Sequence, residues 1–177
     1  MFKKGLISGF ILGIVLIISA IGYLFYTAGS TIEETATVAQ KERFKKMELI
    51  LHDLEGREIN LKDYSDKTIL INFWGTWCAP CIAEMPFLQE VYHTVKDDYV
   101  FLMITDESLD EVIPFTKKNA YDFTFALSNK KIRGQIPTFS TTYILDKDHN
   151  VTHFKKGSFD ESNKESLVAL LREISKN

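Results

Sequence analysis

Two cysteines, Cys78 and Cys81, are the residues of this chain whose type and spacing most clearly support chemistry. They are the only cysteines among 177 residues, and they enclose Ala79 and Pro80. With two residues between them, the sulfurs can close into a disulfide within one helical turn, so the pair can cycle between dithiol and disulfide. The spacing therefore predicts thiol-disulfide exchange.

The same spacing has two other interpretations. Half of a zinc site would need further ligands, but the chain has no other cysteine, and its four histidines are scattered without ligand spacing. A purely structural disulfide would close so short a loop that it would constrain the unfolded chain little. We therefore prefer redox exchange, and we expect no metal and no cofactor beyond the cysteine pair itself.

The cysteine pair follows an apolar strand and opens a helix. Residues 69–74 read Ile-Leu-Ile-Asn-Phe-Trp, and the composition becomes helix-like after Gly75 and Thr76. The first turn of a helix presents unpaired N–H groups and a partial positive charge, which stabilise a thiolate over a thiol. Cys78, the more N-terminal cysteine, is therefore expected to be the acidic and exposed one.

Residues 72–86 resemble the active-site segment of the thioredoxin superfamily, in particular of the membrane-anchored TlpA/ResA-like thiol-disulfide oxidoreductases. The resemblance extends more loosely from about Met47 to the C-terminus. It implies an α/β thioredoxin-like fold, with a central mixed sheet flanked by helices and an added N-terminal β-hairpin. It also implies that Cys78 attacks a substrate disulfide and that Cys81 resolves the mixed disulfide.

The resemblance further marks Glu84 as a catalytic acid. Glu84 lies three residues after Cys81 and matches a glutamate that in the resembled group tunes a thiol pKa or accepts a proton. An exposed helix glutamate is the alternative. Asn72 stands where thioredoxin itself carries a buried aspartate, and two roles are open for it: a bridge to neighbouring backbone, or a part in the exchange reaction.

Substrate binding is expected at two places. Trp74 and Trp77 should form an apolar rim beside Pro80, although either tryptophan can instead belong to the core. The second place is the loop opposite the cysteines, where members of the superfamily place a cis proline whose preceding backbone pairs with substrate.

Two registers compete for the position of that cis proline. The motif Ile136-Pro137-Thr138 favours Pro137, whereas a gap-free count back from the turn at residues 146–149 puts Ser140 in the same place. A cis bond before a residue other than proline costs about 3 kcal/mol, so a serine there predicts a trans or strained loop. We prefer Pro137 on its motif, keep Ser140 as the alternative, and expect Ile136 beside them.

The N-terminal region predicts a membrane anchor. Lys3 and Lys4 precede an uncharged apolar run over residues 6–26, which is about the length that spans a bilayer as a helix. Lysines before the run and none shortly after it predict a cytoplasmic N-terminus and an exported remainder. The alternative is a cleaved signal peptide, whose apolar core is shorter. Outside the cytoplasm, a chain with a single cysteine pair keeps it for exchange.

The chain therefore divides into an anchor at residues 1–26, a linker at 27–46 and a thioredoxin-like domain at 47–177. With 45% apolar residues, the chain can hold one ordinary core, and its formal charge of −3 gives no reason to expect nucleic acid. Strands are expected at 47–54, 57–61, 68–74, 99–105, 123–127, 141–145 and 151–155. Helices are expected at 79–96, at 109–119 behind a Ser108–Glu111 capping box, and after a Ser162–Glu165 capping box.

These features together predict a single-pass membrane protein whose catalytic domain lies outside the cytoplasm, in the periplasm or on the outer face of the plasma membrane. The resemblance implies that it reduces disulfides of exported proteins, fed by a transmembrane electron donor of the thiol-reducing type. Maturation of c-type cytochromes is one task of such proteins. The alternatives are a disulfide-forming oxidase with the same site, a thiol peroxidase, or a non-catalytic chaperone-like binding module.

Overall fold

The computed structural model describes residues 13–24 and 38–176, and the chain divides into two units between Glu42 and Arg43. Residues 13–24 and 38–46 are helical. Within the described ranges, no helix is both long enough and apolar enough to cross a membrane. The rest of the expected anchor, and residues 27–37 of the expected linker, lie outside the described residues.

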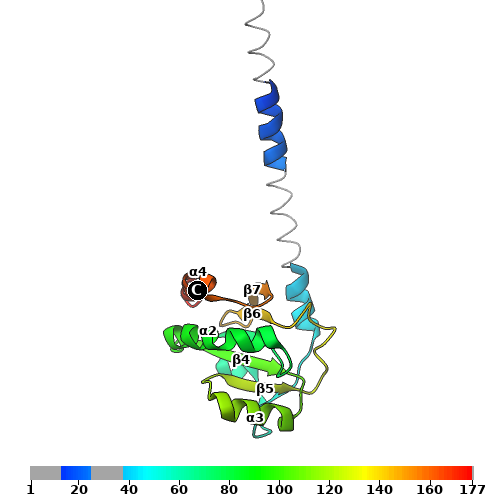
Figure 1. The fold of residues 1–177 in the computed structure, drawn as a ribbon, viewed down its shortest axis with the longest axis vertical. Coiled ribbons are helices and arrows are strands. Elements are labelled where there is room, and N and C mark those ends of the chain that lie inside the picture. Colours follow the sequence, from blue (N-terminus) through cyan, green and yellow to red (C-terminus); the bar gives the residue numbers. More distant parts are fainter. Residues whose placement is uncertain (1–12, 25–37, 177) are drawn as a thin grey trace, which may run out of the picture. The chain divides into compact units, whose positions relative to one another are not determined.

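A mixed β-sheet organises the unit Arg43–Asn177 (Figure 1). Its strand order, within the described residues, is β2-β1-β5-β4-β3-β6-β7. The strands are β1 Leu51–His52, β2 Glu58–Ile59, β3 Thr68–Phe73, β4 Tyr99–Thr105, β5 Thr124–Ser128, β6 Thr141–Leu145 and β7 Val151–Lys156. Every residue of β3 is buried, as its nearly unbroken apolar sequence predicts. β3 pairs in parallel with β4 and antiparallel with β6, which places the start of the cysteine loop at the middle of the sheet.

The helices α2 Ala79–Val95, α3 Leu109–Asn119 and α4 Lys164–Ile174 contribute to one hydrophobic cluster on one face of the sheet, through side chains such as Leu88, Val112 and Leu171. This arrangement follows from the connections. The crossovers β3-α2-β4 and β4-α3-β5 step in the same direction along the sheet, and right-handed crossovers then place both helices on the same face.

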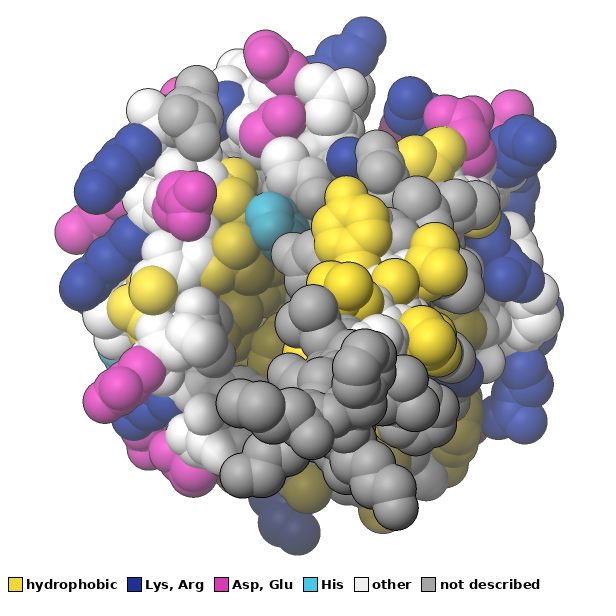
Figure 2. Space-filling view, turned by 90° about the horizontal axis from the view of Figure 1, so that it is seen from above, with side chains coloured by type: hydrophobic (Ala, Val, Ile, Leu, Met, Phe, Trp, Pro, Cys, Tyr) yellow, Lys and Arg dark blue, Asp and Glu magenta, His cyan; other side chains and the backbone are white. Residues whose placement is uncertain are grey.

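The other face is covered mainly by the N-terminal part of the same unit and by residues 128–139. Met47, Leu51 and Ile132 pack there against the strands, and the ring of Phe44 lies 4.9 Å from that of Tyr143. Arg43 donates a hydrogen bond to the carbonyl oxygen of Gly134 at 3.1 Å. Figure 2, a view at right angles to that of Figure 1, has basic and acidic side chains interspersed around its periphery.

Local signals predicted most of the elements. β1 and β2 form the expected antiparallel hairpin, with Gly56 in its turn at φ 81°. Both hydrogen bonds of the Ser108–Glu111 capping box are present at the start of α3. The prediction of a Ser162–Glu165 capping box, however, is wrong. The side chain of Asp160 caps the short 3-10 helix η2 Glu161–Asn163, and α4 begins only at Lys164, because an aspartate carboxylate just upstream accepts from the backbone first.

Candidate active site

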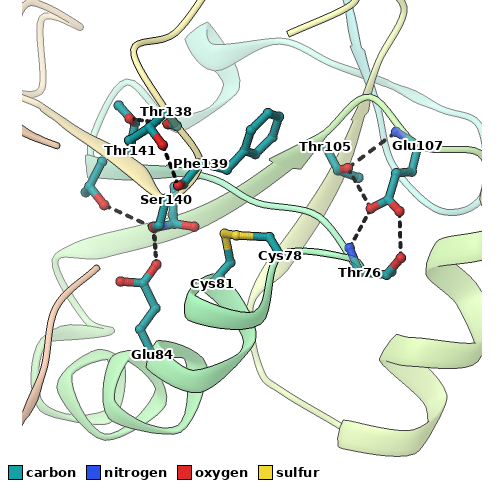
Figure 3. The surroundings of a disulfide bond; sticks show 12 residues. Thr76, Cys78, Cys81, Glu84, Thr105, Glu107, Thr138, Phe139, Ser140 and Thr141 are labelled. Carbon is teal, nitrogen blue, oxygen red and sulfur yellow. Dashed lines mark hydrogen bonds between the residues drawn. A yellow bond between two sulfur atoms is a disulfide. The ribbon is translucent and has the colours of Figure 1, made fainter. Parts of the chain in front are cut away.

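Cys78 and Cys81 form a disulfide at the start of α2, with their Cα atoms 5.3 Å apart (Figure 3). Cys78 is the N-cap residue of the helix, and its backbone N–H donates to the carbonyl of Gly75 at 3.0 Å. Pro80 occupies the first helical turn, where its missing N–H breaks no helical hydrogen bond. The sequence signals for a thiol pair at a helix start therefore correspond to the structure.

The expected exposure of Cys78 is wrong for this oxidised form. Its exposed fraction is 4%, and Cys81 is completely buried. Cys78 lines a groove of about 620 Å³ together with nine other residues. The partner that attacks or is attacked by Cys78 must therefore enter the groove.

The groove has two walls. The first is formed by Trp77, Cys78, Ala79 and Pro80, and the second by six residues between positions 133 and 139. Trp77 is 51% exposed, and its ring packs edge-to-face against Phe139 at 4.8 Å. The guanidinium of Arg133 lies 4.5 Å from the centre of the Trp77 ring, a cation–π distance. Of the expected substrate-binding residues, Trp77, Pro80, Ile136 and Pro137 line this groove.

Trp74 does not belong to the rim, and that prediction is wrong. Its side chain is completely buried and packs against Phe115 and Phe125, with ring centres 4.9 and 5.4 Å away. Strand geometry explains the difference, because residues directly after β3 continue to alternate between the two faces, and Trp74 falls on the face covered by the helices. Among the described residues, its indole N–H has no hydrogen-bond partner.

Ser140, and not Pro137, holds the cis position, so the preference for Pro137 is wrong. Within the described residues, the only cis peptide bond joins Phe139 to Ser140. Thr141 then pairs with Phe73, so the gap-free register places the loop correctly. Pro137 remains in the groove wall, whereas Ser140 is buried and turns its hydroxyl towards Glu84.

Glu84 is buried, with 2% of its surface exposed, which rejects the alternative of an exposed helix glutamate. Its carboxylate accepts hydrogen bonds from the Asn72 amide at 2.9 Å, from the Phe159 N–H at 2.8 Å and from the Ser140 hydroxyl. Burial raises the pKa of Glu84 above its usual value, while these three hydrogen bonds and the charge of Lys155 oppose the rise. A buried carboxyl of this kind can hold or release a proton.

Asn72 links side chains rather than neighbouring backbone. Its amide nitrogen lies 2.9 Å from the Ser140 hydroxyl and 3.1 Å from the Thr142 hydroxyl, in addition to its bond to Glu84. The amide therefore joins β3, α2 and β6 at one point behind the disulfide (Figure 3 shows Glu84 and Ser140 there). Asn72 therefore helps to hold the Glu84 carboxylate and the Ser140 hydroxyl together.

Sequence reasoning missed two carboxylates, Asp106 and Glu107. Both directly follow β4, and Glu107 accepts hydrogen bonds from Thr76 in the loop that leads to Cys78. A signal was present, since the carboxyl ends of the parallel strands β3 and β4 must lie side by side. Across residues 13–24 and 38–176, no group of three or more acidic, histidine or cysteine side chains is arranged to hold a metal ion.

Comparisons with known proteins identify relatives of this chain. Residues 28–171 match the Redoxin family. Thiol-disulfide oxidoreductase ResA of Bacillus cereus (strain ATCC 10987 / NRS 248) is 32% identical, over 91% of this chain and 92% of that protein. ResA of Bacillus thuringiensis subsp. konkukian (strain 97-27) is 30% identical, over 97% and 98% respectively.

A solved structure of a DsbF homologue from Corynebacterium diphtheriae is also similar. It has a TM-score of 0.60 and 28% identity, covering 71% of this chain and 83% of that chain. The Redoxin match covers the cysteine pair, the residues that line the groove and the seven strands of the sheet. The chain therefore belongs to the Redoxin family, as a TlpA/ResA-like thiol-disulfide oxidoreductase of the thioredoxin superfamily.

Proposed function

We propose that this protein is a membrane-anchored, extracytoplasmic reductase that reduces disulfides of exported proteins through Cys78 and Cys81. The observation that carries the proposal is that Cys78, disulfide-bonded to the buried Cys81, lines an open, largely apolar groove of about 620 Å³. An extended segment of a protein substrate fits such a groove, because apolar side chains on either side of its disulfide can rest against Trp77 and Phe139.

The reducing cycle uses two electrons. The Cys78 thiolate attacks one sulfur of the substrate disulfide, forms a mixed disulfide and releases the other substrate sulfur as a thiolate. Cys81 then attacks the Cys78 sulfur, releases the second substrate thiolate and closes the Cys78–Cys81 disulfide. The two enzyme thiols supply both protons. Glu84, three residues after Cys81 on α2, is proposed to accept or relay the proton that Cys81 must lose.

The proposed membrane location rests on residues 13–24. Eight large hydrophobic side chains of this helix are between 43% and 68% exposed: Ile14, Val15, Leu16, Ile17, Ile18, Ile21, Tyr23 and Leu24. A helix that is apolar on all sides is unfavourable in water and suited to lipid. We infer that it is part of a single-pass anchor over residues 6–26, with the N-terminus in the cytoplasm and the catalytic domain at the outer face.

The oxidised pair must be reduced again after each cycle. A domain outside the cytoplasm has no direct access to cytosolic thiols, so we propose a transmembrane donor of the thiol-reducing type as its partner. Cytochromes of the c type attach haem through two cysteines in a C-x-x-C-H segment, which must be reduced first. Maturation of such cytochromes is therefore one process that this protein is proposed to serve.

The reduction potential of the intact protein, equilibrated in detergent with glutathione or dithiothreitol, tests the direction. A potential near that of thioredoxin, about −270 mV, would support a reductase. A potential near that of DsbA, about −120 mV, would favour the alternative, an oxidase that uses the same groove and cysteines.

A further inference from the structure

Two consecutive carboxylates follow strand β4 and lie beside the cysteine loop. β4 ends at Thr105, and Ile104 is the parallel partner of Phe73 in β3. Asp106 and Glu107 therefore emerge at the edge of the sheet where β3 passes into the loop that carries the cysteines. Each carboxylate makes a hydrogen bond to the residue that directly precedes one wall of the groove, Thr76 before the first and Ile132 before the second.

Glu107 holds the first wall. Its carboxylate accepts from the Thr76 N–H at 2.7 Å and from the Thr76 hydroxyl at 2.6 Å, and it is steadied by the Thr105 hydroxyl at 3.1 Å (Figure 3). The indole of Trp77 also lies close to this loop. A Cβ atom placed on Gly75 would lie 2.8 Å from the indole nitrogen of Trp77 and 3.2 Å from Glu107. The loop is therefore closely fitted around this carboxylate, immediately before Cys78.

Asp106 holds the second wall. Its carboxylate accepts from the N–H of Ile132 at 2.7 Å, and its carbonyl oxygen lies 3.4 Å from the ammonium of Lys131. Ile132 is completely buried, and its own carbonyl accepts from the N–H groups of Gln135 and Ile136 at 2.8 and 3.3 Å. The turn that presents residues 133–137 to the groove is thus fixed at Ile132.

The two walls meet at Arg133, whose guanidinium covers the ring of Trp77. Because Asp106 and Glu107 are consecutive, one peptide unit with a Cα separation of about 3.8 Å sets the spacing of the two attachment points. Neither carboxylate lines the groove itself. Their hydrogen bonds act through Thr76 and Ile132.

We propose that Asp106 and Glu107 are positioning residues that together fix the separation of the two groove walls and so determine how well an extended polypeptide disulfide reaches Cys78. The proposal rests on thiol-disulfide exchange at Cys78, and it is independent of the direction of that exchange in the cell. A small disulfide needs only access to the sulfur, whereas a polypeptide must contact both walls.

The test compares alanine with amide variants in the intact, detergent-solubilised protein. E107A and D106A remove the acceptors. In E107Q, the side-chain carbonyl can still accept from the Thr76 N–H while its amide donates to the Thr76 hydroxyl, and in D106N the carbonyl can still accept from Ile132. Steady-state kinetics are measured with dithiothreitol as reductant and two substrates: a synthetic peptide with one disulfide and apolar flanking residues, and hydroxyethyl disulfide.

For the peptide, E107A and D106A are expected to raise KM and to lower kcat/KM about tenfold, equivalent to 1.4 kcal/mol. E107Q and D106N should remain within about threefold of the natural protein, because they keep the hydrogen bonds to Thr76 and Ile132. For hydroxyethyl disulfide, every variant should stay within about twofold. Rescue by the amide and the difference between substrates are effects that a general loss of stability would not produce.

Glu111 provides the matched control. Its carboxylate lines the same charged hollow beside Trp77 as Asp106 and Glu107 do, but its hydrogen bonds go to Ser108 at the start of its own helix. E111A should therefore leave kcat/KM for the peptide within about twofold. If E107A does not fold, as judged by circular dichroism, T76V removes only the hydroxyl bond and should lower kcat/KM about threefold.

The outcomes distinguish a failure of the positioning role from a failure of the proposed exchange activity. The positioning role is overturned if E107A and D106A have the same kcat/KM for the peptide as the natural protein. If E107A is unfolded, T76V takes its place in this comparison. Equal losses with the peptide and with hydroxyethyl disulfide would also overturn it. A natural protein that reduces neither substrate would contradict the exchange activity itself, which is a different result.

Discussion

The hydroxyl of Ser140 donates a hydrogen bond to the carboxylate of Glu84, although the two residues are 56 positions apart in the chain. This bond joins the helix that carries the cysteines to the residue that precedes β6, and both of its partners are buried. The pKa of Glu84 therefore depends on the position of the loop that forms the second wall of the groove. Predictions about pH and about this loop follow from the same contact.

Glu84 should make the stability of the oxidised protein depend on pH. Its folded-state pKa is raised above the usual value of 4.5, so between 4.5 and the raised pKa the folded protein binds more protons than the unfolded chain. Stability should then fall as pH rises through that window, by at most about 1.4 kcal/mol per pH unit. Urea unfolding from pH 4 to pH 8 measures this slope.

E84Q should remove that contribution to the slope. The Asn72 amide can turn to accept from the new amide, because its carbonyl oxygen has no partner among the described residues. E84Q should therefore fold, and should exceed the natural protein in stability increasingly towards pH 8. Parallel stability curves for the two proteins would show that folding does not raise the pKa of Glu84.

S140A should lower the free energy of unfolding by about 1–3 kcal/mol, because it removes a donor from a buried carboxylate. Chemical denaturation of the oxidised protein near neutral pH measures the loss. Ser166 offers a matched control, since its hydroxyl donates to the carbonyl of Asn163 on an exposed helix surface. S166A should change stability by less than about 0.5 kcal/mol. Equal effects of the two substitutions would contradict the importance of the Ser140 contact.

The two tryptophans should separate stability from substrate binding. W74A removes a completely buried side chain and should cost about 3–5 kcal/mol of stability. W77A removes a half-exposed ring from the groove and should cost less than about 1 kcal/mol, but it should raise KM for a peptide disulfide. Denaturation and peptide-reduction kinetics are measured on both variants. A larger loss of stability in W77A than in W74A would contradict the assignment.

C81S should accumulate mixed disulfides between Cys78 and exported proteins, because the resolving thiol is absent. The species should appear in membranes on non-reducing gels and disappear after dithiothreitol treatment. C78S should give none, since Cys81 is completely buried. Trapping by C78S at a level similar to C81S would reverse the assignment of the attacking cysteine.

A charge within residues 13–24 should weaken membrane association. Replacing Leu16 and Ile18 together by lysine places two charges on a helix whose exposed large side chains are hydrophobic, at a cost of about 3 kcal/mol each in a bilayer. The double variant should move from the carbonate-resistant membrane fraction towards the soluble fraction. Exchange of the same residues for valine is the control, and an unchanged distribution of the lysine variant would argue against the proposed anchor.

The sequence predicted what is encoded locally. The apolar run of β3, the thiol pair at a helix start and the Ser108–Glu111 capping box each depend on residues within a few positions, and each is present. The side on which Trp74 points was not predictable in this way. A side chain at the groove rim and one in the core differ by one step of strand alternation. Trp74 lies in the core because α3 covers its face of the sheet, where Phe115 packs against it.

Contacts between distant segments account for the remaining differences. Ile136-Pro137-Thr138 matches the superfamily motif, yet pairing of Thr141 with Phe73 fixes the register and places Ser140 opposite the cysteines. The hydrogen bonds of Asp106 and Glu107 join residues about 26 and 31 positions apart. The order of the strands indicates that the loops after β3 and β4 lie side by side, but no periodicity or short motif identifies which residues pair there.

The Arg43–Gly134 hydrogen bond shows that the chain just before Met47 also supports the groove, in addition to connecting the domain to the preceding residues. Gly134 belongs to the groove wall, and Phe44 packs on Tyr143 beneath the same sheet. A soluble fragment that begins at Met47 would lack both contacts, so its groove would be less firmly supported than that of the whole protein. Mechanical tension on the chain at position 43 would likewise be transmitted to the substrate groove.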